Sequence, residues 1–276
     1  TSNQSWCGSE LKPYHSFKML KLMYLPLRAR GEALRMLLRH ADIPFVDHIV
    51  PFSEWPALKP TVPNNQLPQL QLGSSGRLLP QSKDIALHIA SLAGPPLLPS
   101  DAATAEDALD CWQILHSTSV PHLAVGSDPW GENVPWDARL GAVNPLLNFL
   151  PADVALPIIP SYLAGARGWL HNVVELRLST TPGPFMGGKA PHHGDFATFH
   201  VVDNICTLDG GQLLASASLR AQQWHGAMHD LPAVASYLRQ RPQAGSGEVG
   251  KPGSLIFEHA RPADIVARSL EHGSAG

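Results

Sequence analysis

Apolar patterns typical of β-strands are confined to the first part of the chain. Residues 18–27, "KMLKLMYLPL", predict a buried strand, and residues 45–50, "FVDHIV", predict a second, shorter one. Between them, residues 31–41 carry apolar side chains at helical spacing, namely Ala33, Leu34, Leu37, Leu38 and Ala41. A strand, a helix and a strand in this order predict a βαβ unit with two parallel strands.

A second set of elements follows the βαβ unit. "PFSEWPALKPTVPNN", residues 51–65, is too rich in proline for regular structure. "LPQLQL" and "RLLP" predict a hairpin around "GSSG", and Ser82 is expected to cap a helix that runs to about Ser91. The order βαβ, loop, ββα is the thioredoxin arrangement.

Pro68 stands directly before the third predicted strand. Because proline has no N–H, one interpretation is an edge strand or a bulge. The other is a cis Leu67–Pro68 bond, which turns the chain and leaves the backbone of Leu67 free to pair with a ligand. In the thioredoxin arrangement a proline at this position lies beside the active corner.

The chain changes character at "GPPLLPSD", residues 94–101. This segment reads as a linker, and no strand alternation follows it, so the second domain is expected to be all-helical, with core helices at 161–178 and 194–208. An exposed loop is expected at 126–136 and a short helix near 262–270. The resulting division is a thioredoxin-like domain at 17–94, a linker at 95–101, an all-helical domain at 102–243, and extensions at 1–16 and 244–276.

Composition excludes several classes of function. The chain has 276 residues and a net charge of −3, and its Lys and Arg are scattered, so we expect no nucleic-acid partner. No apolar run is long enough for a bilayer span, and the three widely spaced cysteines fit neither a disulfide framework nor a zinc site. These features favour a cytoplasmic protein; because the first residue is Thr, targeting by a removed leader stays open.

The corner after the first strand reads "YLPLRARGE" and contains no cysteine, which excludes thiol exchange there. It offers Tyr24 at the end of the strand, and Arg28 and Arg30 just before the helix. Taken alone, a strand tyrosine is more often a packed aromatic side chain than a catalyst.

Four segments together resemble one family. "MYLPLRARGEALRMLL", "SEWPALKPTVPNNQLPQLQL", "PQSKDIALHIA" and "PFMGGKAPHHGDFATFHVVD" are similar to the soluble glutathione transferases of the tyrosine type, most like sigma class and next like pi class. The resemblance implies a glutathione transferase fold over about residues 17–243, a homodimer, glutathione as co-substrate and a small hydrophobic electrophile as its partner.

Carried over by position, the resemblance implies that Tyr24 donates its hydroxyl to the glutathione sulfur and that Arg30 lies near it. Leu67, before Pro68, would pair its backbone with the cysteinyl part of glutathione. The remaining implied contacts are Gln81 and Ser82 to the γ-glutamyl carboxylate, and Trp55, Lys59 and Gln66 at the glycyl end. Without the resemblance, Lys59 reads as a solvated loop charge.

The chain departs from the family pattern at several positions. Ala29 replaces the glycine of R-G-R, which costs about 1 kcal/mol if the position needs positive φ. His192 replaces the Ser or Thr that caps the buried helix, so half of the capping pair with Asp195 is expected to be missing. Asp110 is left out of the site because it stands a turn early for the family's acidic residue.

Other candidate residues point to bland roles. His225 and His229 have the helical spacing of metal ligands but lack a third ligand, so surface positions are favoured and no metal is expected. His192 and His193 are interpreted as loop residues, and Cys111 and Cys206 as small core residues.

Three functions stay open. The first is conjugation of glutathione to small electrophiles. The second is a glutathione-dependent isomerisation of the prostaglandin D synthase type, and the third is a binding or structural role. The full set of glutathione residues argues against the third.

Overall fold

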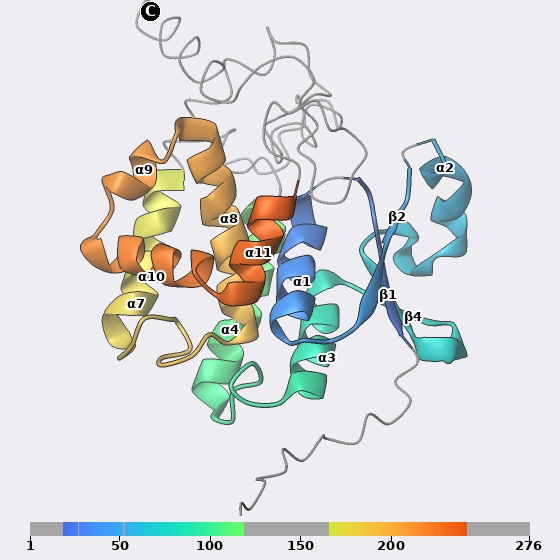
Figure 1. Cartoon of the computed structure of the whole chain (residues 1–276), viewed down its shortest axis with the longest axis horizontal. Helices are drawn as coiled ribbons and strands as arrows, with labels where there is room; N and C mark the ends of the chain where they lie inside the picture. Colours follow the sequence, from blue (N-terminus) through green and yellow to red (C-terminus); the bar gives the residue numbers. More distant parts are fainter. Residues whose placement is uncertain (1–18, 27, 52, 119–165, 242–276) are drawn as a thin grey trace, which may run out of the picture.

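The structure is a computed structural model that describes residues 19–26, 28–51, 53–118 and 166–241. The extensions at 1–16 and 244–276, the loop at 126–136, the short helix at 262–270 and the first residues of the helix at 161–178 lie outside this part, and their predictions stay predictions. The described part divides into a mixed sheet with its helices and a helical C-terminal domain (Figure 1).

The N-terminal domain is built on a four-stranded sheet in the order β2-β1-β3-β4. β1 (Leu20–Tyr24) pairs parallel with β2 (Phe45–Ile49), and α1 (Ala29–His40) connects them. β3 (Gln69–Leu72) pairs antiparallel with both β1 and β4 (Arg77–Pro80), and α3 (Ser82–Ala93) follows. This confirms the predicted βαβ-ββα order.

The proline-rich segment between β2 and β3 is more regular than predicted. It forms α2 (Trp55–Leu58) and two short 3₁₀ turns, η1 (Lys59–Thr61) and η2 (Pro63–Asn65). Each of the three has a proline in its first two positions, where the missing N–H forfeits no helical hydrogen bond. The prolines therefore start short helices instead of preventing them.

The start of α3 also differs from the prediction. Ser82 is the first helical residue and not its cap; the N-cap position is Gln81, at φ 69°. The positive φ of Gln81 turns the chain into the helix one residue before Ser82, so the Ser82 side chain lies within the first turn.

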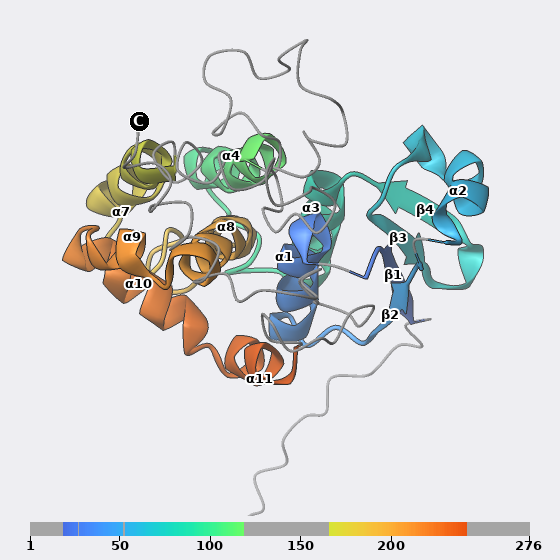
Figure 2. The same cartoon turned by 90° about the horizontal axis from the view of Figure 1, so that it is seen from above.

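The C-terminal domain is helical, as predicted. Its described elements are α4 (Ala102–Thr118), the π-helix η5 (Leu170–Glu175) with α7 (Leu176–Thr180), α8 (His193–Asp209), α9 (Gln212–Ala215), α10 (Leu219–His229) and α11 (Pro232–Gln240). α8 is the buried central helix, and α1 and α3 lie between the sheet and these helices (Figure 2). In the part of the chain that the structure describes, no helix has both the length and the apolar character needed to cross a bilayer.

α8 begins with a capping box, which corrects the expectation that half of it is missing. The imidazole Nδ1 of His192 accepts the amide hydrogen of Asp195 at 3.2 Å, and the Asp195 carboxylate accepts from the His192 amide at 3.0 Å. A histidine can replace Ser or Thr here because an unprotonated ring nitrogen is an acceptor of the same kind. Asp195 also accepts from the indole of Trp224 at 2.8 Å, which fixes α10 against α8.

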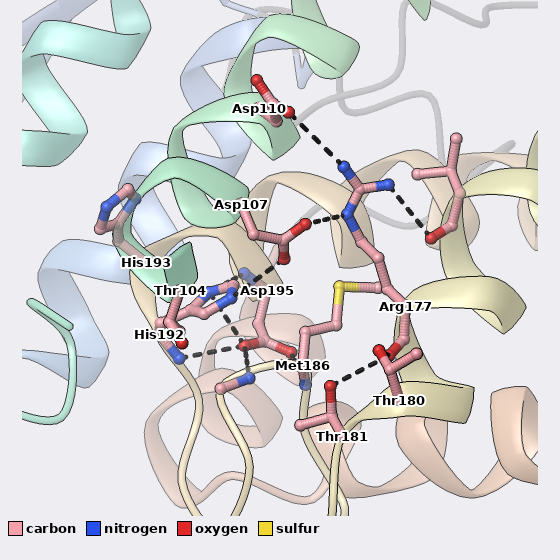
Figure 3. Close-up of polar contacts among 12 residues, drawn as sticks. Thr104, Asp107, Asp110, Arg177, Thr180, Thr181, Met186, His192, His193 and Asp195 are labelled. Carbon is pink, nitrogen blue, oxygen red and sulfur yellow. Dashed lines mark hydrogen bonds and ion pairs between the residues drawn. The ribbon is translucent and has the colours of Figure 1, made fainter. Parts of the chain in front are cut away.

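Of the two adjacent histidines, His192 is the N-cap at the end of the loop and His193 begins the helix, so the loop interpretation is wrong for His193. His192 is buried, and its other ring nitrogen lies 3.7 Å from Asp107 of α4 (Figure 3). His193 is in the first turn of α8, where its Nδ1 accepts from the indole of Trp112 at 3.0 Å. Both rings serve the contact between α4 and α8.

Candidate active site

Tyr24 ends β1 with its ring inside the protein. Its side chain is buried, and its hydroxyl oxygen accepts a hydrogen bond from the backbone N–H of Arg30 at 3.2 Å. The first amides of a helix have no partner within the helix. The Tyr24 hydroxyl therefore satisfies one amide at the start of α1 and is held there by it.

The electrostatic environment keeps the Tyr24 hydroxyl protonated. Burial raises the pKa of Tyr24 above its ordinary value, and the opposing influence of Arg30 and Arg35 does not cancel that effect. Because the bond from Arg30 uses an oxygen lone pair, it leaves the hydroxyl hydrogen free to be donated. The corner thus holds a neutral, oriented O–H donor.

The backbone at this corner matches a position that favours glycine. Ala29, at the first position of α1, has φ 31°, in the left-handed region. Ala29 therefore has the positive φ at which a residue with a Cβ costs about 1 kcal/mol relative to glycine. Arg30 follows it, and burial lowers the pKa of its guanidinium.

The Leu67–Pro68 peptide is cis, as one of the two interpretations predicted. The edge-strand alternative is wrong, because β3 lies between β1 and β4. Gln69 supports the turn that leads here: its buried side-chain amide donates to the carbonyl of Pro63 at 2.9 Å and to that of Gln66 at 2.8 Å. Sequence reasoning missed Gln69, whose buried role is hidden by its polar side chain.

Two of the other predicted residues meet beside this turn. The Gln81 amide donates to the side-chain oxygen of Gln66 at 3.3 Å, and both side chains are exposed. Ser82 follows at the N-terminus of α3, a helix end that favours an anion. Backbone amides and polar side chains are therefore gathered at one surface of the domain.

Trp55 and Lys59 lie on the separate segment formed by α2 and η1. Trp55 is partly buried and Lys59 is exposed. Among the described residues, no hydrogen bond or ion pair joins them to Tyr24 or to Gln66 and Gln81. The structure thus brings Tyr24 into direct contact with Arg30, and Gln66 into direct contact with Gln81. It places Trp55 and Lys59 on the adjoining segment of α2 and η1.

Sequence reasoning named no partner for Arg28, and the structure supplies one. Its guanidinium is buried and lies 4.0 Å from the Asp203 carboxylate of α8. Burial, together with the nearby positive charge of Arg241, lowers the pKa of Arg28 to about 10. The "RARGEALR" segment therefore carries charges that face the C-terminal domain.

Glu32 is the centre of this buried cluster. One carboxylate oxygen accepts from Arg241 at 2.8 Å and the other from the Tyr237 hydroxyl at 2.8 Å, with Arg35 at 3.5 Å. Burial disfavours its charge, but the surrounding arginines outweigh burial and lower the pKa of Glu32. The helix that holds Tyr24 is thus tied to α8 and α11.

Within the described residues, the candidate histidines and cysteines form no hydrogen bond or ion pair with the predicted glutathione-binding residues. The His225 ring packs against Phe199 with centroids 5.0 Å apart and is partly buried, whereas His229 is exposed, as predicted. Cys111 is buried, which confirms the core interpretation, whereas Cys206 is only partly buried. Over the described ranges, no group of three or more His, Cys, Asp or Glu side chains is placed to hold a metal ion.

The known proteins similar to the chain in sequence include glutathione S-transferases and hematopoietic prostaglandin D synthases. No protein-family model matches the chain. It is 43% identical over 74 residues to "Probable glutathione S-transferase 8" of Caenorhabditis elegans, a stretch that is 27% of this chain and 35% of that protein. The chain thus spans about a third of the length of the first curated relatives it matches.

A longer match extends into the helical domain. The chain is 30% identical over 158 residues to hematopoietic prostaglandin D synthase of Mus musculus, covering 56% of this chain and 71% of that protein. In structure it is similar to the crystal structure of the glutathione S-transferase from Ascaris lumbricoides, with a TM-score of 0.65 and 20% identity, over 82% of this chain and 98% of that one. This last likeness concerns the fold.

Proposed function

The chain belongs to the glutathione S-transferase family, and we propose that it conjugates the thiolate of glutathione to small hydrophobic electrophiles. The observation that carries this proposal is the Tyr24 hydroxyl, protonated, buried and oriented by the Arg30 amide at 3.2 Å. Such a donor is suited to stabilising a sulfur anion placed next to it.

The chemistry follows from the protonation of the thiol. A free thiol has a pKa of about 8.5, so near neutral pH most of it is protonated and unreactive. A hydroxyl that donates to the thiolate more strongly than to the thiol lowers that pKa, and the proton leaves to solvent. The thiolate then attacks the electrophilic carbon, a C–S bond forms, and the leaving group departs with its electron pair.

We assign the glutathione contacts as the family resemblance implies. Leu67 pairs its backbone with the cysteinyl unit, and Gln81 with Ser82 holds the γ-glutamyl carboxylate at the start of α3. Gln66, Trp55 and Lys59 surround the glycyl end, and Arg30 adds positive charge near the sulfur. The contact of Gln66 with Gln81 at 3.3 Å supports placing these two residues in one site.

The finer assignments are part of the same proposal. We assign the protein to sigma class and to a twofold dimer in which each N-terminal domain faces the partner's helical domain. The domain limits are 17–94 and 102–243. Sedimentation that shows only a species of about 30 kDa at micromolar concentration contradicts the dimer and leaves the fold unaffected.

A second function is favoured by one specific observation. The mouse relative, matched over 71% of its length, is a prostaglandin D synthase, so a glutathione-dependent isomerisation at the same site is the alternative. A parallel assay with chlorodinitrobenzene and with a prostaglandin endoperoxide distinguishes the two reactions. Retention on glutathione resin without turnover of either class indicates a binding protein instead.

The test of the catalytic assignment is Tyr24→Phe. We expect nearly unchanged glutathione affinity, turnover lower by roughly ten to a thousandfold, and an apparent pKa of bound glutathione that rises towards its free value. The matched control is Tyr237→Phe, which removes the same atom from a buried tyrosine bonded to Glu32. That control is expected to lower stability and to leave the pKa of the bound thiol in place.

The outcome that contradicts the assignment is a Tyr24→Phe enzyme with the rate and pH profile of the wild type for several electrophiles. In that case another group activates the sulfur, and Arg30 is the first to test, because the corner contains neither serine nor cysteine.

A further inference from the structure

Gly31 lies directly against the ring of Tyr24. A Cβ atom built on Gly31 would be 2.4 Å from Cδ1 of the Tyr24 ring, 2.7 Å from Cγ and 3.0 Å from Cε1. Separations this short are well below the van der Waals contact of two carbon atoms, about 3.5–4.0 Å. The backbone of α1 therefore approaches the ring as closely as it does because residue 31 has no side chain.

The ring has little room to move away from α1. Tyr24 is 6% exposed, so neighbouring atoms surround it. The clash would fall on Cγ and Cδ1, near the base of the ring, which cannot shift without turning the whole side chain. Such a turn carries the hydroxyl with it.

Two further groups of the same helix hold Tyr24. The Arg30 amide donates to its hydroxyl at 3.2 Å, and the Arg35 guanidinium lies 5.8 Å from the ring centroid. In the first turns of α1, Arg30 thus contacts the Tyr24 hydroxyl, Gly31 lies beside the Cγ–Cδ1 side of the ring, and Arg35 lies near the ring. The hydrogen bond from the Arg30 amide to the hydroxyl depends on the short distance between α1 and the ring that Gly31 permits.

We infer that Gly31 is a positioning residue for the Tyr24 hydroxyl, and that the absence of a side chain at residue 31 sets how strongly that hydroxyl stabilises the thiolate. The inference rests on the proposed function, because it concerns the donor assigned there. It assigns Gly31 no contact with glutathione.

The direct test is Gly31→Ala. The added methyl pushes the ring from α1, so we expect the Arg30 bond to weaken and turnover to fall by roughly a hundredfold, the size of effect seen for a 1 Å misplacement. The apparent pKa of bound glutathione should rise, and the KM of the variant for glutathione should change little. A merely structural role for Gly31 would leave that pKa unmoved in the fraction that folds.

Gly226→Ala is the matched control. Gly226 lies within α10, and a Cβ built there meets nothing within 4 Å. The same change of residue type in a helix should therefore leave both the turnover and the thiol pKa at wild-type values.

Poor folding of Gly31→Ala does not end the test. In a Tyr24→Ala background Cγ and the ring are both gone, so the added methyl has space, and the double variant should fold as well as Tyr24→Ala alone. Equal loss of folded protein in both backgrounds overturns the contact. Folded Gly31→Ala with wild-type turnover and thiol pKa overturns the positioning role.

The two failures are distinguishable. If Tyr24→Phe has no effect, the proposed function of Tyr24 fails, whatever Gly31→Ala does. If Tyr24→Phe behaves as expected and Gly31→Ala resembles the wild type, only the inference about Gly31 fails.

Discussion

The Tyr237 hydroxyl in α11 donates a hydrogen bond to Glu32 in α1 at 2.8 Å, although 205 residues separate them in the chain. Arg241 donates to the other oxygen of the same carboxylate at 2.8 Å, and also to Asp203 of α8 at 2.7 Å. The helix that orients Tyr24 is therefore fixed to the helical domain through buried charges. Buried pairs of this kind are costly to break singly, because the partner is left with uncompensated charge.

The first prediction concerns Glu32→Gln. Its carboxylate is fully buried among Arg28, Arg35 and Arg241, so removing its charge leaves buried guanidinium groups undercompensated. We expect the free energy of unfolding to fall by about 3 kcal/mol or more, measured by urea denaturation. Glu106→Gln, at an exposed position of α4, is the control and should stay within about 0.5 kcal/mol of the wild type. Equal stability of the two variants contradicts the prediction.

The second prediction concerns the His192 cap and pH. Burial disfavours the charged ring, but the carboxylates of Asp195 and Asp107 outweigh burial and raise the pKa of His192. A raised folded-state pKa means that the protonated ring favours the folded state. The attraction of the two carboxylates then outweighs the loss of the Asp195 amide hydrogen bond, which Nδ1 no longer accepts once it carries a proton. Its contribution is complete below the usual value of about 6.5 and is lost as the pH rises through the raised folded pKa.

The measurement compares the wild type with His192→Ser, which keeps an acceptor at the cap but does not titrate. The difference in unfolding free energy, wild type minus variant, should be more favourable to the wild type at pH 5.5 than at pH 8.5. Asp107→Asn removes the carboxylate 3.7 Å from the ring and should reduce this pH dependence. A difference that stays constant across the range shows that His192 does not titrate as described.

The third prediction concerns Ala29→Gly. Ala29 has φ 31°, which strains a residue with a Cβ and not glycine. We expect the substitution to stabilise the protein by roughly 0.5–1 kcal/mol, visible as a higher Tm. Ala103→Gly, at an exposed position in the first turn of α4, should instead destabilise the protein by up to about 1 kcal/mol, the cost of glycine in a helix. Loss of stability in Ala29→Gly contradicts the assigned strain.

Local sequence patterns predicted most of the framework. The apolar runs and helical spacings indicated β1, α1, β2, the β3–β4 hairpin and α8, because period and turn residues act over a few neighbours. Pro68 left two interpretations, an edge strand or bulge and a cis bond before β3, and the structure confirms the cis bond. The short helices at 55–65 were missed, since a high proline content indicates turns without saying that prolines at first positions start them.

The candidate site was predicted residue by residue only through resemblance to a family. Tyr24 alone reads as a packed aromatic side chain, and nothing in "YLPLRARGE" indicates that the Arg30 amide bonds its hydroxyl. The role of Gln69, buried and bonded to two carbonyl groups of the preceding turn, was equally invisible, because a polar residue in a strand is normally expected to face solvent.

By itself the sequence determined the order of strands and helices and the absence of a thiol at the corner after β1, and it gave the cis Leu67–Pro68 bond as one of two interpretations. Only the tertiary structure decided that Glu32 meets Tyr237 and Arg241, that His192 completes the cap of α8, and that Gly31 touches the Tyr24 ring. The division has a physical reason. Backbone preferences depend on neighbours in the chain, whereas buried charges and close contacts depend on which distant segments pack together, and that packing is settled only when the whole core forms.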